Sequence, residues 1–457
     1  MPAPESYARS LGNALWQRRD YILLFVLAFA LRFAMHRFSV EQIGAEKLLA
    51  TSPDTINYVA AGKALAQGSG DYEVAFWAFG PGYASFLAAN FVLFGVRATP
   101  AVIIQILLSS LACLLVYKFA QKLLRSRAIA VVAGLLAALS YTAISLSCLL
   151  LSDTLFFFLF ALSLVLYLKG LTERCWWPFI LSGLLVGCGI LTRPIGQFWP
   201  AAMVVIAIFS RRLVGDVHRE SPRNSRLTTI VQPVIAVGIA LLIALTWAFR
   251  NNAVHGVPAV AISSAGGPIN IAAETAAKPQ GLTREEQLTL WIKAFLEETN
   301  QKEFTPADSY RLFRSKSLEI FRNRPIDMIR TLLHWSWINV NDICHLHRLL
   351  IPKSNPKTIP LEKTILKSGL NFLNLSLCIV GMVLLLATRR FGALLVLGSV
   401  YCYFFLTVGG TRWQGSRLFL PGQLAAVVLI ALTLVSTAKA AFHGLVLVFR
   451  RLRYNAS

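Results

Sequence analysis

The chain has 457 residues, of which 56% are apolar and 14% charged, and its mean hydropathy is +0.60. A soluble domain of this length does not need so many apolar residues, and the same composition excludes a disordered chain, a coiled coil and a disulfide-rich secreted scaffold. The net charge of +22 is carried by basic residues that lie between long apolar runs, so it does not indicate a nucleic-acid partner. The sequence therefore predicts a membrane protein.

About ten apolar runs are candidates for membrane-spanning helices, since a span needs roughly 20 apolar residues. In chain order they are residues 21–38, 100–119, 129–151, 154–168, 177–191, 196–209, 228–248, 370–387, 391–408 and 418–435. We expect an all-α polytopic membrane protein, because a helix satisfies its own backbone groups inside the bilayer.

Basic residues occupy every second link between these runs. Examples in chain order are Arg18, Arg127, Arg174, Arg212, Arg390 and Arg451. Because lysine and arginine accumulate in cytoplasmic links, the other links are expected to face outside. The outer parts are then residues 37–99, the corners at Asp153 and Arg193, residues 250–367 and the turn 409–417.

The chain is predicted to have three parts and no separate globular domain. Residues 1–249 form an N-terminal transmembrane module with a first outer loop at 37–99. Residues 250–367 form an external loop with amphipathic helices, and residues 368–457 form C-terminal transmembrane helices with a basic cytoplasmic tail.

Both outer segments are expected to contain helices that lie on the membrane surface. In the first, Ser52-Pro53-Asp54 is typical of a helix start and Gly68 of a helix end. Residues 80–95 are apolar, but inserting them would reverse every later loop, so they predict an interfacial helix. In the second segment, amphipathic helices are predicted at residues 286–296, 310–321 and 326–340.

Asp54 and Asp153 stand out because acidic residues are scarce and both fall at the outer ends of apolar segments. Either carboxylate could take a proton from a substrate hydroxyl in a cleft at the membrane surface. The alternative is that each only complements the dipole of the helix that it begins.

Arginines at outer helix ends form a second set of candidates, consisting of Arg193, Arg250, Arg412 and Arg417. The orientation rule does not explain them, because they lie opposite to the cytoplasmic excess. A guanidinium at the lipid boundary suits an anionic headgroup, whose oxygens it binds in pairs. The alternative is snorkelling to generic lipid phosphates.

Two further motifs are weaker. The segment from Ser263 to Pro268 contains Gly266 and Gly267 and is predicted to be a loop that can point backbone N–H groups at an anion or a sugar. Asp342, Cys344, His345 and His347 have the chemistry of metal ligands, but no second Cys/His pair stands at zinc-finger spacing. We therefore expect no metal site there.

Several motifs follow one another in a familiar order: Ser52-Pro-Asp54-Thr-Ile-Asn-Tyr58, Gly80-Pro-Gly-Tyr83, Leu151-Ser-Asp153, Leu191-Thr-Arg193-Pro194, Trp247-Ala-Phe-Arg250-Asn251, Arg322-Asn-Arg-Pro325 and Arg417-Leu-Phe-Leu-Pro421. In this order and spacing, over about residues 21–435, the chain resembles the bacterial polyprenyl-phosphate-sugar glycosyltransferases of the C superfold (GT-C). Their relatives include lipid A aminoarabinose transferases and protein O-mannosyltransferases.

The resemblance implies Asp54 as the catalytic base, Asp153 as a second carboxylate of the site and the outer arginines as a clamp for the donor phosphate. The substrate-binding residues that it implies are Tyr58, Arg193, Arg250, Asn251, Ser263, Gly266, Gly267, Arg412 and Arg417. It implies no cofactor. A divalent metal is not favoured, because Asp153 lacks the paired acidic motif of oligosaccharyltransferases and has Ser152 and Thr154 beside it.

The expected reaction is the transfer of a hexose or pentose from a polyprenyl-phosphate donor to a lipid, glycan or protein acceptor. The carboxylate would activate the acceptor for in-line attack at the anomeric carbon, with inversion, while arginines stabilise the leaving phosphate. The location implied is the cell inner membrane, in contact with the bilayer and with the site facing the periplasm or exterior.

Two other functions remain open from the sequence. A transporter or lipid-linked sugar flippase would also be polytopic, but such proteins often carry charges at the middle of the membrane. Here the candidate residues gather at one outer surface. A non-catalytic scaffold would leave the outer arginines and carboxylates without a role.

Overall fold

The structure is a computed structural model of the chain and describes residues 4–70, 72–173, 175–215, 226–341, 370–410 and 415–455. Every regular element of this described part is a helix, so the all-α prediction is confirmed. The predicted site residue Arg412 and the candidate metal ligands at 342–347 lie outside the described residues.

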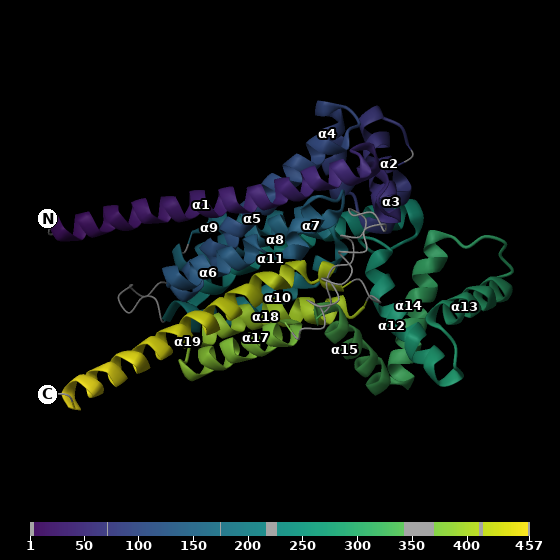
Figure 1. The fold of residues 1–457 in the computed structure, drawn as a ribbon. Coiled ribbons are helices and arrows are strands. Elements are labelled where there is room, and N and C mark those ends of the chain that lie inside the picture. Colours follow the sequence, from purple (N-terminus) through teal and green to yellow (C-terminus); the bar gives the residue numbers. More distant parts are fainter. Residues whose placement is uncertain are drawn as a thin grey trace.

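Eleven of the described helices run alongside one another as a bundle (Figure 1). They are α1 (Pro4–Ile43), α5 (Ala98–Leu124), α6 (Arg127–Ala138), α7 (Tyr141–Ser147), α8 (Ser152–Glu173), α9 (Trp176–Thr192), α10 (Trp199–Gly215), α11 (Arg226–His255), α17 (Leu370–Ala387), α18 (Phe391–Val408) and α19 (Leu420–Asn455). The start of α1 and the end of α19 project from the same end of this bundle.

Other helices, none longer than 18 residues, cover the opposite end of the bundle (Figure 1). They are α2 (Pro53–Gln67), α3 (Glu73–Phe79), α4 (Gly82–Phe94), α12 (Ser263–Ala277), α13 (Arg284–Thr299), α14 (Pro306–Asn323) and α15 (Pro325–Asn341), with single 3₁₀ turns η1 (Glu46–Ala50), η2 (Pro194–Gly196), η3 (Lys278–Gln280) and η5 (Gly415–Arg417). The two segments predicted to be external therefore meet at one end. The three amphipathic helices predicted in the second segment are present as α13, α14 and α15.

The expected number of about ten spans is not confirmed. Within the described residues, six helices are long and apolar enough to cross a membrane, or seven if the bent pair of α6 and α7 is one span. Each predicted run does contain a helix, but α9 and α10 have only 17 residues each. A helix that short is less than about 27 Å long, below the roughly 30 Å of a bilayer core.

The break between α6 and α7 divides the run predicted at 129–151 and bends it by 50°. Arg32 of α1 is fully buried there and donates to the carbonyl oxygens of Ala137 and Ala138, at 3.4 and 3.1 Å, and to the Ser109 hydroxyl at 2.7 Å. These carbonyls lie at the end of α6, where acceptors lose their usual partners in the next turn; that of Ala137 also accepts from the backbone N–H of Ser140 at 3.4 Å. A buried guanidinium thus stabilises the break.

Helix α8 lies at the centre of the bundle, since 72% of the residues in its most apolar stretch are buried, against 28% for α1. It packs against α5 on one side and α9 on the other. Asp153, in the first turn of α8, is therefore held by the most enclosed of the six candidate spans among the described residues, at the end where the outer helices gather.

We expect Arg32→Met to lower the free energy of unfolding by about 2–4 kcal/mol, because several buried acceptors lose their donor. Unfolding of the purified protein in detergent, followed by circular dichroism, measures this change. Arg37→Met is the matched control on the same helix, since Arg37 is exposed and forms only a 3.6 Å pair with Glu41. Equal losses for the two variants would contradict the role of Arg32.

Candidate active site

Asp54 is positioned by the start of α2, as predicted. The Ser52 hydroxyl accepts a hydrogen bond from the backbone N–H of Thr55 at 3.1 Å, and Pro53 occupies the first helical position. The helix ends at Gly68, which has a φ of +70°. Helix α2 packs on α4, which has 13 residues and is too short to cross a bilayer by itself.

Asp153 follows a compact turn that a buried glutamine holds in place. Gln105 of α5 donates from Nε2 to the carbonyl oxygen of Leu149 at 2.7 Å. Its Oε1 accepts a 2.5 Å hydrogen bond from the hydroxyl of Tyr83 on α4. The sequence interpretation missed Gln105, although a lone glutamine inside an apolar run is a signal of a buried polar contact.

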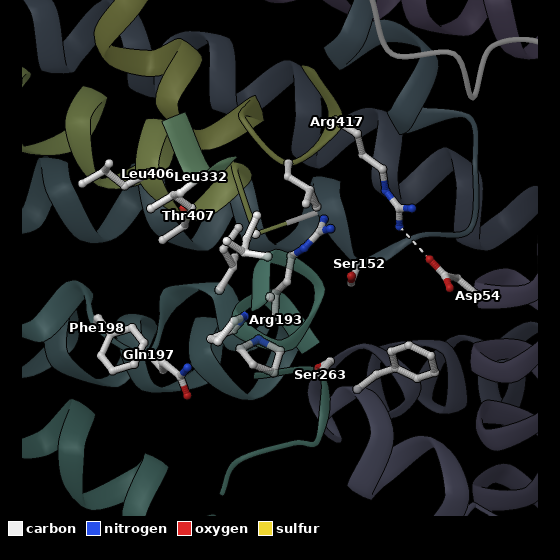
Figure 2. A pocket seen from close by; sticks show the side chains of 18 of the residues that line it. Asp54, Ser152, Arg193, Gln197, Phe198, Ser263, Leu332, Leu406, Thr407 and Arg417 are labelled. Atoms are coloured by element: carbon white, nitrogen blue, oxygen red, sulfur yellow. Dashed lines mark hydrogen bonds and ion pairs between the residues drawn. The ribbon is translucent and has the colours of Figure 1, made fainter. Parts of the chain in front are cut away.

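Two arginines from distant parts of the chain converge on these carboxylates. Arg193, at the end of α9, forms an ion pair with Oδ1 of Asp153. Arg417, in η5, donates from Nε to Oδ2 of Asp153 and from Nη2 to Oδ2 of Asp54, each at 3.1 Å. Figure 2 shows Arg417 directed toward Asp54. The cluster pairs two carboxylates with two guanidiniums.

The two carboxylates differ in their access to the cavity. The Asp54 side chain is 37% exposed and the Asp153 side chain 1%. Asp54 can therefore meet a substrate, whereas Asp153 is enclosed and orients both arginines.

Tyr58 lies one turn after Asp54 on α2 and is buried against α3 and α4. Its hydroxyl donates to Oγ of Ser152 at 3.3 Å. Burial raises the pKa of Tyr58 above its ordinary value of 10.0, so the phenol stays protonated at neutral pH. Tyr58 can donate a hydrogen bond there but is no general base.

A cavity of about 470 Å³ opens beside this cluster. Its polar lining consists of Asp54, Tyr58, Ser152, Arg193, Gln197, Ser263, Thr407 and Arg417. Its apolar lining includes Phe198, Ile271, Phe321, Met328, Ile329, Leu332 and Leu406. In Figure 2 the pair of Arg417 and Asp54 lies at one side, with Phe198, Leu332 and Leu406 at the other.

The prediction of a loop at Ser263–Pro268 is wrong, because these residues form the first turns of α12. Ser263 and Gly267 line the cavity, and Gly266 is not among its lining residues. A Cβ atom on Gly410 would lie 2.9 Å from the Cα of Gly267. Gly267 thus permits a close approach between α12 and the end of α18. It does not form a turn.

Arg250 and Asn251 do not line the cavity. Arg250 forms an ion pair with Glu73 of α3, and His255 Nε2 lies 2.9 Å from the other oxygen of that carboxylate. Although burial opposes its ionisation, these hydrogen bonds hold the pKa of Glu73 below its ordinary value of 4.5. The sequence interpretation missed Glu73, and this charged contact ties α3 to the end of α11.

Asn251 instead shapes the turn that leads to α12. It is fully buried, and its Nδ2 donates to the carbonyl oxygens of Ala259 and Val260 at 3.1 and 2.9 Å. Shortly beyond, the N–H of Ile262 donates to the carbonyl oxygen of Trp77 at 2.9 Å. The contacts of Asn251 therefore position the start of α12 beside the first outer loop.

The donor set of the cavity does not fit a divalent metal. In the described ranges, no three or more His, Cys, Asp or Glu side chains group together as a metal site would need. The guanidiniums use both oxygens of Asp153 and Oδ2 of Asp54, and their positive charge repels a cation. The expectation of no metal stays a prediction.

Comparison with known proteins relates this fold to glycosyltransferases. The family model described as dolichyl-phosphate-mannose-protein mannosyltransferase matches residues 79–220, less than half of the chain. No curated protein sequence matches the chain.

Solved structures similar to it include the following two. The archaeal oligosaccharyltransferase AglB of Archaeoglobus fulgidus, solved with an inhibitory peptide and a dolichol-phosphate, aligns with a TM-score of 0.54 and 16% identity, over 97% of this chain and 52% of that chain. The apo structure of ArnT from Cupriavidus metallidurans aligns with a TM-score of 0.35 and 15% identity, over 91% and 77% of the two chains. The chain thus spans about half the length of the archaeal enzyme, and the expected C-superfold architecture is confirmed by that likeness.

Proposed function

We propose that the protein is an integral-membrane, inverting glycosyltransferase that moves a sugar from a polyprenyl-phosphate donor to an acceptor at the outer face of the membrane. The observation that carries this proposal is the composition of the cavity. One end holds paired carboxylates and arginines, and the rest is apolar. A sugar joined through phosphate to a prenyl chain is likewise polar and charged at one end and apolar along the rest of its length.

The apolar part of the cavity is open at the surface of the helical bundle. Phe198, Phe321, Ile329 and Leu406 line it and are each between 45% and 65% exposed. Phe198 directly precedes α10, and the other three belong to α14, α15 and α18, so several elements form one apolar rim. Large apolar side chains at a cavity mouth suit a lipid better than water, and a prenyl chain can leave sideways between these helices.

Arg193 and Arg417 are placed to hold the donor phosphate. Both guanidiniums line the cavity, and Arg417 has more N–H groups than its contacts with Asp54 and Asp153 use, so its remaining donors can meet phosphate oxygens. The N-terminal end of α12, at Ser263, also lines the cavity and adds a partial positive charge. Charge that develops on the leaving phosphate is stabilised without a general acid.

Asp54 is the base in this proposal, since its carboxylate is the one open to the cavity. It takes the proton of the acceptor hydroxyl or amine as the new bond forms at the anomeric carbon. The bond from the anomeric carbon to the phosphate oxygen breaks on the opposite side, and its electron pair leaves with the phosphate. A single displacement of this kind inverts the anomeric configuration.

The comparisons support the donor class. The matching family model is named for dolichyl-phosphate-mannose, and the archaeal neighbour was solved with a dolichol-phosphate. The proposal also includes a hexose or pentose as the transferred sugar and the cell inner membrane as the location. A transporter is not favoured, because the charged cavity is lined by residues of α2 and α12, which lie at one end of the bundle.

Asp54→Asn should abolish sugar transfer while donor binding is largely kept, because the amide preserves shape and removes only basicity. Transfer of labelled sugar from purified polyprenyl-phosphate mannose or aminoarabinose to cell-envelope lipids measures this. Glu46→Gln is the matched control, since Glu46 is an exposed acid in the same outer loop. Near-normal turnover by the Asp54 variant would rule out this residue as the base.

Arg417→Lys and Arg193→Lys should each lower kcat/KM by about ten- to a hundredfold, because a lysine cannot reproduce a planar, paired contact with phosphate. Arg250→Lys should have a smaller effect, since Arg250 contacts Glu73 outside the cavity. Steady-state kinetics with a defined donor compares the three. Activity near that of the wild type for both cavity variants would leave the phosphate clamp without support.

Reporter fusions test the orientation. A reporter that follows α19 should lie in the cytoplasm, and one inserted between α13 and α14 should lie outside, because the basic links are expected in the cytoplasm. If both reporters lie on one side, the proposed outer location of the site is wrong.

A further inference from the structure

A second cavity, of about 490 Å³, lies between α14 and the turn that follows α11. We call it the α14 groove. Its lining consists of Asn252, Gly256, Pro258, Tyr310, Arg311, Arg314, Ser315 and Leu318. None of these residues lines the cavity beside Asp54.

The α14 groove is cationic. Arg311 and Arg314 are both exposed, and no carboxylate lines the groove. The acidic residues of α14 are engaged elsewhere, since Asp308 accepts from Thr305 in a capping box and Glu319 forms a 2.9 Å pair with Lys316. Neither arginine forms an ion pair with any other residue that the structure describes.

The walls of the groove are rigid. Gly256 has a φ of +67°, and a Cβ atom on it would lie 3.2 Å from Cβ of Ala307, at the start of α14. On the other face of α14, Leu312 and Ile320 are buried, and Ile320 packs with Ala272 of α12. The arginines therefore project from a helix whose position is set by packing, which lowers the entropy lost when they bind a ligand.

One face of α14 connects the groove to the cavity beside Asp54. Arg311, Arg314 and Leu318 line the groove, and Phe321 lines the cavity. Their spacing of three, four and three residues places them on one side of a helix. At a rise of about 1.5 Å per residue, the arginines lie roughly 10–15 Å along α14 from Phe321.

We infer that the α14 groove binds a phosphate group of the acceptor while the donor phosphate lies at Arg193 and Arg417. Two arginines without a carboxylate are suited to phosphate, which they bind with charge-assisted hydrogen bonds. The donor phosphate cannot fill this groove, because it must adjoin the anomeric carbon near Asp54. The inference rests on the proposed function and makes the acceptor a phosphorylated molecule whose reacting group reaches the cavity along α14.

Binding of dihexanoyl phosphatidic acid and of inorganic phosphate to the purified full-length protein in detergent tests this site. Arg311→Gln combined with Arg314→Gln should weaken binding of the phosphate probe at least about tenfold. Lys293→Gln combined with Lys302→Gln removes the same charge from exposed positions outside the groove, and should change affinity by less than about twofold.

The two probes separate the sources of the phosphate. A preference for phosphatidic acid identifies a lipid headgroup, and equal binding of both identifies a soluble phosphorylated acceptor. Either result supports the site. Unchanged affinity in the arginine variant, or an equal loss in the lysine control, would overturn it.

Transfer assays connect the site to the reaction. With envelope lipids as acceptor, the arginine variant should need about tenfold more acceptor, with the KM for the donor unchanged. A raised KM for the donor instead would overturn the assignment to the acceptor. The binding titrations need no turnover, so a failure of the glycosyltransferase proposal in the Asp54→Asn assay is distinguishable from a failure of this site.

Discussion

The Arg417 guanidinium organises the site by joining three distant parts of the chain. It bonds Asp54 at the start of α2 and Asp153 at the start of α8, although it lies itself just before α19. Without this cation, two carboxylates would face one another at the edge of an apolar bundle, where their repulsion is weakly screened. With it, and with Arg193, the charges balance and the carboxylate oxygens have fixed directions.

Hydrogen bonds inside the bundle hold the segments that carry these charges. Gln105 fixes the turn before Asp153, and the Ser416 and Thr142 hydroxyls, 2.8 Å apart, tie η5 to α7. Arg32 in turn stabilises the break from which α7 begins. In a low-dielectric interior such contacts are strong and leave few alternative geometries. The site is therefore preorganised, which is what the proposed stabilisation of a developing phosphate charge requires.

In the proposed reaction, two cavities among the outer helices bind the donor and the acceptor separately. The cavity beside Asp54 combines a charged end with an apolar rim, whereas the α14 groove combines arginines with polar groups. Helix α14 borders both, with its buried side packed on α12. The contact between Glu73 and Arg250 keeps the first outer loop beside the end of α11, so the two outer segments close over one site.

Local features of the sequence determined the helices and their ends. Apolar runs predicted the bundle, and Ser52-Pro53-Asp54 predicted the start of α2, because capping and hydrophobicity act within a few residues. They also predicted that Asp54, Asp153, Arg193 and Arg417 lie at one end. Only the tertiary structure decided which charges pair, since the partners Glu73 and Arg250 are far apart in sequence and hydropathy does not encode contacts. It also shows that Ser263–Pro268 is helical and that Gly267 lies close to Gly410, a contact invisible to local turn propensity.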